Sequence, residues 1–544
     1  MSPHKADVLS VQEVGTSEVQ SKDAARLGEL GYQQELRREW SSLESFAISF
    51  SIISICTGIT TSFSLGLTNG GPGVMSIGWI CVSIMTMFVA LSMAEVVSAI
   101  PTSGGPYHWS ALLARPQHSA FVSYLTALYN LLGQAAVTTS IVFGNANLIA
   151  AVASLYGFES TAPRLIAITA ALLVLGGVIN SLGIKVLAWV NRFSVVLHSC
   201  GVFSICVALL VKAPTHRSAK QVFDTFNDST GDPGWSVIAS PAYVALTGIL
   251  LAQFTITGFD ASAHMAEETR NAGKAAPKGV IMSVGISAFF GFFYLVSLLF
   301  CIQNFEDTLG SPTGQPVLQI FVDVFGREGG TAAMSIIIAC VTLCGTCSMT
   351  SNSRMYYAFS RDSGIPKWFD YVDKRTQTPI RTVWLAVVLS FCLVLPALGS
   401  TVAYVAVTSI ATIGLYISYV IPIAVGVAFD QRRFKAVRGP FHLGRFSRPC
   451  AIISTLYVAF ITVIFCLPTA TPVDKETLNY APVAVGIVFV WVIGSWFLWA
   501  RKWFHGPRQT ALGTLEGASR FERQITNDKS DEKYPGEAMQ SPTI

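Results

Sequence analysis

Phe254-Thr-Ile-Thr-Gly-Phe-Asp-Ala-Ser-Ala-His-Met-Ala-Glu-Glu268 is the stretch that decides the fold. It begins inside an apolar run that starts near Pro241, and Thr257, Gly258 and Asp260 interrupt that run. A carboxylate within a membrane-crossing run is costly, and such residues usually face a cavity or an ion path. Glycine weakens a helix interior, and a broken helix exposes backbone groups that a solute can bind. The stretch therefore predicts a broken membrane helix at a binding site. The alternative is that Asp260 only caps the helix half that follows it.

The composition is that of a polytopic membrane protein. Of the 544 residues, 51% are hydrophobic and 12% are charged, whereas a soluble domain carries about 25% charged residues. The formal net charge of +4 is small and gives no reason to expect nucleic-acid binding. Nearly all of the 11 cysteines lie in apolar runs without a histidine pair. We therefore predict no disulfide framework, no metal site and no cofactor, and no motif indicates an enzyme.

Apolar runs of spanning length predict an all-α protein with twelve transmembrane helices in a transporter domain over residues 44–503. The polar segments 1–43 and 504–544 are predicted to be disordered tails. The predicted spans are 45–66, 73–100, 121–154, 164–184, 188–211, 241–263, 279–302, 331–358, 382–398, 401–428, 449–468 and 481–502.

Loop charges predict the orientation. Lys and Arg concentrate in the loops on the side of the N-terminus, which places both termini in the cytoplasm by the positive-inside rule. The sequon Asn227-Asp-Ser229 then falls in an outer loop, and Asn227 is predicted to be a glycosylation site.

The first apolar run carries a second interruption, Cys56-Thr57-Gly58-Ile59-Thr60. If residues 44–211 and 241–428 are inverted units, followed by peripheral helices in 449–503, Gly58 and Gly258 break matching helices. Paired interruptions in two halves indicate a transporter site. The alternative for Gly58 is close helix packing by small residues.

Ionisable and hydroxyl groups within other runs are candidates for further roles. His198 can carry a proton, or it can be a neutral histidine bonded to a carbonyl. Ser348 and Ser351 are candidates to line an ion site. Arg354 and Arg361 are seven residues apart on one helix face, and we expect them to pair with acids at the inner surface. We expect Glu95 to neutralise an inner cation.

These motifs resemble the amino acid–polyamine–organocation (APC) superfamily over roughly residues 40–503, and in particular its amino acid/choline branch of GABA and choline permeases. The residues that carry the resemblance are Thr255 to Thr269, Ala276-Pro277-Lys278-Gly279, Gly70-Gly71-Pro72, Glu95 with Pro101-Thr-Ser-Gly-Gly-Pro-Tyr107, Ser353-Arg354 and Ser360-Arg361-Asp362.

The resemblance implies the LeuT-like fold, with five plus five inverted helices and two peripheral ones. It implies that broken helices 1 and 6 hold the solute, with Phe254 as aromatic gate and Gly258 as the unwound glycine. Cys56 replaces the first glycine of the family's helix 1 motif. His198 stands where proton-coupled relatives place a lysine, so the coupling ion, proton or sodium, stays open.

We therefore predict a secondary active transporter, coupled to protons with sodium as the alternative ion, in the plasma membrane rather than the vacuolar membrane. N–H groups at Thr57, Gly58 and Ile59 would bind the carboxylate of an amino acid such as GABA, and carbonyls from Phe254 to Thr257 would bind its ammonium. Choline or a polyamine is the alternative solute, held by aromatic faces or Asp260. A nutrient sensor on the same fold is the alternative function. The predicted solute-binding residues are Thr57, Gly58, Ile59, Thr60, Phe254, Thr257, Gly258, Phe259 and Asp260.

Overall fold

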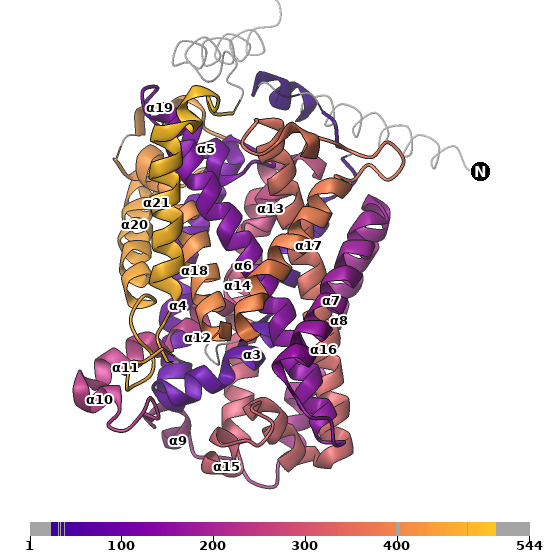
Figure 1. The fold of residues 1–544 in the computed structure, drawn as a ribbon, viewed down its shortest axis with the longest axis vertical. Helices are drawn as coiled ribbons and strands as arrows, with labels where there is room; N and C mark the ends of the chain where they lie inside the picture. The colour runs from indigo at the N-terminus through magenta and orange to yellow at the C-terminus, as the bar shows by residue number, and fades with distance from the viewer. Residues whose placement is uncertain are drawn as a thin grey trace, which may run out of the picture.

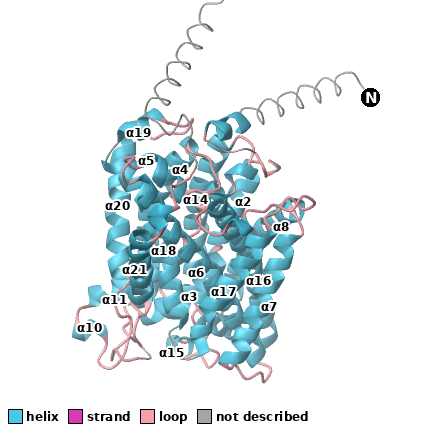
Figure 2. Ribbon diagram, turned by 45° about the horizontal axis from the view of Figure 1, so that its top comes forward, coloured by secondary structure: helices cyan, strands magenta, loops and turns pink. Residues whose placement is uncertain are grey.

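The computed structural model describes residues 23–507, except 31, 33, 37, 399–402, 430 and 476. All helices and turns in this part form one multi-span helical bundle (Figures 1 and 2). By length and composition, 11 segments of the described chain can cross a membrane. They are α2 (Ser42–Ile53) with α3 (Ile55–Thr68), α4 (Gly71–Ala99), α6 (Ser119–Ser154), α7 (Ala162–Ser181), α8 (Ile184–Lys212), α14 (Ala272–Phe300), α16 (Pro316–Arg361), α17 (Ile380–Val394) with η3 (Leu395–Leu398), α18 (Ala403–Ile423) with the π-helix η4 (Ala424–Phe429), η5 (Gly444–Phe446) with α20 (Ser447–Ile464), and α21 (Ala481–Leu498).

Shorter helices connect these segments. They are α5 (Pro106–Leu113), α9 (Ala219–Phe223), α10 (Trp235–Ile238), α11 (Pro241–Gly248), α12 (Leu250–Thr255), α13 (Ala261–His264), η1 (Ala266–Glu268), α15 (Phe305–Leu309), η2 (Lys367–Phe369), α19 (Gln431–Ala436) and η6 (Ala500–Lys502).

The run predicted as a sixth span, 241–263, is a series of short helices. The helices α11 and α12 end at Thr255, and α13 starts only at Ala261. Between them Gly258 has φ +94°, a conformation that side chains with a Cβ rarely adopt. The predicted break at Gly258 is confirmed. Because of this break, 241–263 is not a continuous spanning helix, and the described chain has 11 spanning segments instead of the predicted twelve.

The first span is also broken, but at Ser54 rather than at Gly58 as predicted. Ser54 has φ +31° and ψ +78°, between α2 and α3. Gly58 lies inside α3, and its N–H donates to the Ser54 carbonyl at 3.2 Å. A left-handed serine is strained, and hydrogen bonds of its Oγ to His198 Nε2 (2.7 Å) and to the Thr57 hydroxyl hold it in place.

Long central helices hold the broken segments in the interior. The helix α6 packs against α16 and α18, and α14 packs against α2 and α4. Figure 1 shows α5 and α19 at one end of the bundle, here called the upper end, and α9, α10 and α15 at the opposite, lower end. Both ends of the described chain lie at the upper end (Figure 1).

The described part of the predicted N-terminal tail is packed against the upper end of the bundle. Leu27, Tyr32 and Trp40 are buried, and the Trp40 N–H donates to the Glu268 carbonyl at 3.1 Å. The prediction of an exposed, disordered tail up to residue 43 is therefore wrong from residue 23 on, because apolar side chains in this segment find partners that are distant in sequence. Residues 1–22 and 508–544 lie outside the described chain.

Candidate functional site

The two breaks lie side by side in the bundle. A Cβ on Gly58 would lie 2.6 Å from the Thr255 Cα, so α3 touches the end of α12 through its backbone. A Cβ on Gly258 would lie 2.5 Å from Ile52 Cγ2, so the second break contacts the end of α2. Gly58 therefore allows close packing of two helices, which was the alternative to the predicted break at this residue. Gly258, in contrast, forms the second break itself.

The break at Ser54 leaves backbone donors free at the start of α3. The Thr57 and Gly58 N–H groups, predicted to bind a carboxylate, donate instead to the Ser54 carbonyl at 2.8 and 3.2 Å. Within the described chain, the Ile55 and Cys56 N–H groups make no backbone hydrogen bond. The first turn of a helix has unpaired N–H groups at its positive end, and at the start of α3 these two groups are the unpaired ones.

The break at Gly258 leaves free acceptors. The Ile256 carbonyl accepts from the Tyr416 hydroxyl at 3.1 Å. The carbonyls of Phe254, Thr255 and Thr257 accept no hydrogen bond from the described residues. These three groups lie in the range in which the sequence predicted ammonium acceptors.

The other predicted solute residues are buried around the breaks. The Thr60 hydroxyl lies 2.9 Å from that of Tyr294, and Ile59 and Phe254 are buried. Phe259 packs edge-on against Tyr416, with ring centroids 6.2 Å apart, and lies 5.3 Å from Tyr419.

Asp260 forms a buried polar cluster rather than a helix cap. Its side chain makes no capping bond to α13. Asp260 Oδ2 accepts from Gln134 Nε2 at 2.8 Å and lies 3.1 Å from His264 Nε2. His264 Nδ1 lies 2.9 Å from the Ser103 carbonyl. Asp260 Oδ1 is buried and makes no hydrogen bond within the described chain. His264 was not among the predicted site residues, although its spacing of four residues from Asp260 places the two on one helix face.

His198 links α8 to the first break. Its Nδ1 donates to the Ser194 carbonyl at 2.8 Å, and its Nε2 lies 2.7 Å from the Ser54 hydroxyl. A neutral imidazole satisfies both contacts, because Ser54 can donate to Nε2. Ser348 bonds instead to Thr138 of α6 at 2.8 Å. No contact described in the structure brings Ser348 or Ser351 to His198.

One group of side chains in the described chain could hold a metal ion. Cys56 Sγ, Cys340 Sγ and a His198 ring nitrogen all lie within 4.8 Å of one another, and all three residues are buried. Two thiols and an imidazole suit a thiophilic ion such as zinc or copper(I). The sequence had given no sign of this set, because its members lie on three different helices.

Two buried ion pairs close the upper end. Arg361 binds Glu267 with two hydrogen bonds of 2.9 and 2.8 Å, and Arg354 Nε binds Glu268 at 2.8 Å. Both arginines thus pair with acids, while the location of the pairs at the inner surface stays a prediction. Burial raises the pKa of Glu267, but the charge and hydrogen bonds of Arg361 outweigh burial, and the pKa lies below its ordinary value. Burial outweighs Arg354 at Glu268, whose pKa is raised.

Glu95 and Asn227 have partners other than those expected. Glu95 Oε1 accepts from the Leu443 backbone N–H at 3.1 Å, and the described residues offer it no cation within ion-pair distance. Asn227 Nδ2 donates to the Leu67 carbonyl at 2.9 Å. A glycan on that nitrogen would require this bond to break.

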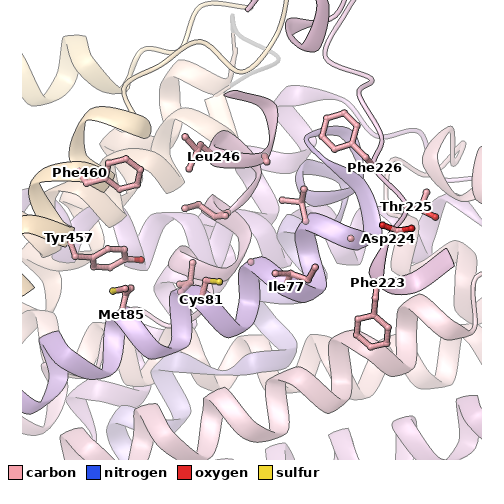
Figure 3. Close-up of a pocket in the computed structure, with 16 residues that line it drawn as sticks. Ile77, Cys81, Met85, Phe223, Asp224, Thr225, Phe226, Leu246, Tyr457 and Phe460 are labelled. Carbon is pink, nitrogen blue, oxygen red and sulfur yellow. The ribbon is translucent and has the colours of Figure 1, made fainter. Parts of the chain in front are cut away.

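The cavities differ in chemistry. A cavity of about 390 Å³ at the lower end is lined by polar side chains such as Thr61 and Thr408, and it reaches within one helical turn of Gly58. A larger cavity of about 600 Å³ lies between α4 and α20, where Figure 3 shows Ile77, Tyr457 and Phe460 around it. Ile77 is 53% exposed, and the lining is mainly apolar, which fits a lipid-facing groove rather than a solute site.

Comparison with known proteins decides the family. Residues 41–491 match the amino acid permease family. The chain belongs to this family. The permease is 43% identical over 500 residues to the amino-acid permease BAT1 homolog of Oryza sativa subsp. japonica, which covers 89% of this chain and 95% of that relative. It is 40% identical over 512 residues to amino-acid permease BAT1 of Arabidopsis thaliana (91% and 98% covered) and 30% identical over 501 residues to amino-acid permease 2 of Neurospora crassa (90% of each). The permease is thus a multi-pass membrane transporter of amino acids, not an enzyme.

Proposed function

We propose that this permease is a secondary active transporter of small zwitterionic amino acids of the GABA type, driven by protons. The observation that carries the proposal is the pair of adjacent helix breaks at Ser54 and Gly258, which leaves free donors on one side and free acceptors on the other. A zwitterion carries one group for each: a carboxylate for the donors and an ammonium for the acceptors.

The carboxylate binds the Ile55 and Cys56 N–H groups, where the positive end of α3 favours an anion. The ammonium binds the Phe254, Thr255 and Thr257 carbonyls. Choline, the alternative solute, has no carboxylate and would leave the two donors unsatisfied. The residues that complete the lining in this proposal are Thr57, Gly58, Ile59, Thr60, Gly258, Phe259 and Asp260.

The same proposal includes a LeuT-like topology in the amino acid/choline branch. We treat α11, α12 and α13 together as the broken twelfth crossing, so that 44–211 and 241–428 are inverted units and α20 and α21 are peripheral. The upper end faces the cytoplasm, because the loops that face it carry most of the Lys and Arg residues. The polar lower-end cavity is then the extracellular entrance of a plasma-membrane protein.

Uptake of labelled solutes by transport-deficient cells tests the proposal. The panel contains neutral amino acids, GABA and choline. We expect saturable uptake of a zwitterion, loss of that uptake in Gly258→Val, and normal uptake in the control Gly486→Ala, whose site in α21 has open space. Uptake of choline alone would overturn the zwitterion site. Surface expression with no uptake of any solute would favour the sensor.

A further inference from the structure

We infer that Asp260 and His264 form the proton-binding site of the permease and hold one proton between them in the closed bundle. This inference rests on the proposed function, since it locates the proton that the proposed coupling requires. The observation behind it is a chain of three polar contacts that a neutral histidine and an ionised aspartate cannot satisfy together: Gln134 to Asp260, Asp260 to His264, and His264 to the Ser103 carbonyl.

The hydrogen bonds fix where protons must be. The Ser103 carbonyl only accepts, so His264 Nδ1 carries a hydrogen. The other ring nitrogen, Nε2, lies 3.1 Å from Asp260 Oδ2. Without a further proton, a nitrogen lone pair and a carboxylate oxygen would face each other at that distance. One added proton resolves the clash, either on Nε2 as imidazolium against carboxylate, or on Oδ2 as an acid that donates to imidazole. Both forms have zero net charge.

Among the described residues, no charged group in contact with the pair would neutralise the charge left when that proton departs. Both side chains are at most 1% exposed. From α18, Tyr416 and Tyr419 lie near Asp260 and offer phenol hydroxyls rather than cations. From α6, the contact is the Gln134 amide.

The remaining described elements packed against α13 place no unpaired charge against the pair. From α14, Gly279 lies beside Ser262, and the lysines Lys274 and Lys278 are exposed. From α2, the Ser45 carbonyl and the Ser49 hydroxyl bond Ser262. From α16, Cys347 packs in the same apolar cluster as Ala261 and Met265. The nearest acids in sequence, Glu267 and Glu268, are each occupied by an arginine of α16.

This isolation provides a coupling device. A buried, unpaired carboxylate is costly, so the closed bundle is stable only with the proton bound. Asp260 is two residues from the break at Gly258, where the proposed solute binds. His264 touches the upper-end loop that contains Ser103 and Gly105, and a Cβ on Gly105 would lie 2.9 Å from the His264 Cε1. Withdrawal of that loop would expose the imidazole to water. The proton then passes from the pair to water or buffer at the upper end, and no other reactant is needed.

His198 is a matched control, because its surroundings require no added proton. Its Nδ1–H donates to the Ser194 carbonyl, and Nε2 accepts from the Ser54 hydroxyl. Substitution of His198 by glutamine removes the hydrogen bond to Ser54 and should lower solute exchange. The exchange that remains should stay coupled to protons, whereas the same change at His264 removes the proton site.

The test uses full-length permease reconstituted in lipid vesicles with the membrane potential clamped at zero. Asp260→Asn, His264→Gln and His198→Gln are compared with the wild type. Counterflow of labelled GABA measures solute exchange without a gradient. Accumulation under an imposed pH gradient, with and without a protonophore, measures coupling. We expect about tenfold accumulation per pH unit for the wild type and His198→Gln, and exchange without accumulation for the Asp260 and His264 variants.

Three outcomes would overturn the inference: accumulation by Asp260→Asn and His264→Gln equal to the wild type, loss of accumulation in His198→Gln but not in His264→Gln, or wild-type accumulation that ignores the protonophore. A variant that does not fold is replaced by Asp260→Glu, which keeps an acid and should shift the pH of half-maximal accumulation.

Absence of counterflow for every zwitterion would refute the proposed solute. The proton site is then tested by a second measurement that needs no solute. Infrared difference spectra of detergent-solubilised wild type and Asp260→Asn are recorded between about pH 5 and 9. We expect a carboxyl or imidazolium signal that titrates and that changes in His264→Gln. A spectrum in which Asp260 titrates identically with and without His264 contradicts a shared proton.

Discussion

Gly58 and Thr255 touch through their backbones, with 2.6 Å between an ideal Gly58 Cβ and the Thr255 Cα. This contact joins the two broken segments, since Gly58 belongs to α3 and Thr255 ends α12. Such a close approach leaves no room for a side chain, so the register between the two breaks depends on a glycine at this position.

Gly58→Ala tests that contact. The added methyl group must push two backbones apart, and overpacking of this kind costs about 1–3 kcal/mol. We expect a lower melting temperature of the solubilised permease and a large loss of uptake. Gly486→Ala is the control, because nothing lies within 4 Å of the added methyl group in α21. Equal stability of the two variants would show that α3 and α12 are less close than described.

Gly258→Ala should fail for two separable reasons. The backbone has φ +94°, which costs an L-residue about 1–2 kcal/mol, and the new Cβ would lie 2.5 Å from Ile52 Cγ2. The double variant Gly258→Ala/Ile52→Ala relieves only the second strain. We therefore expect partial recovery of uptake in the double variant relative to Gly258→Ala, with Ile52→Ala alone as reference. Full recovery would mean that the backbone conformation is unimportant.

The break at Gly258 could be predicted from the sequence and the break at Ser54 could not, for a physical reason. Gly258 follows a recognisable rule, because an isolated glycine beside an aspartate in an apolar run indicates a break. The Ser54 break follows none. Its left-handed backbone depends on the hydrogen bond that its hydroxyl donates to His198, which is distant in sequence, so Gly58, the nearest glycine, was assigned the break instead.

The candidate site shows the same division between local and long-range signals. The pairing of Arg354 and Arg361 with acids could be predicted, because their seven-residue spacing places them on one face. The position of the acids on η1 is a tertiary contact. The Asp260–His264 pair has a local signal, the spacing of four, which sequence analysis did not use. The docking of Trp40 on Glu268 has no local signal at all.

Glu267→Gln should destabilise the upper end strongly. It leaves the buried Arg361 without a counter-charge, and loss of one partner of a buried pair costs about 3–5 kcal/mol. We expect a marked fall in melting temperature that the double variant Glu267→Gln/Arg361→Gln partly reverses. The exposed Glu328→Gln serves as control. Additive losses in the double variant would contradict the direct pairing.

The pH dependence of this pair has a definite sign. The pKa of Glu267 is lowered below its ordinary value, because Arg361 outweighs the effect of burial. The stabilisation is therefore present above the unfolded-state pKa of about 4.3 and is lost only as the pH falls through the lower folded-state pKa. The difference in melting temperature between wild type and Glu267→Gln should be constant from pH 8 to 5. A difference that shrinks over this range would show that the pair is not ionised.

His108 should make the permease sensitive to mild acid. Burial, aided by the positive charge of Arg361, lowers the pKa of His108 to about 3, and its Nδ1 lies 2.6 Å from the Thr102 hydroxyl. The folded protein therefore keeps His108 neutral, whereas the unfolded chain binds a proton below about pH 6.5. Stability must then fall by about 1.4 kcal/mol for each pH unit below that value.

His108→Gln removes this linkage, since glutamine does not titrate. Melting temperatures of solubilised wild type and variant are compared at pH 7.5 and 5.5. We expect the wild type to lose more stability than the variant on acidification, with the gap set by His108 alone because all other groups are shared. Parallel losses in the two proteins would mean that His108 can be protonated in the folded state, and therefore that water or an acid reaches its unbonded Nε2.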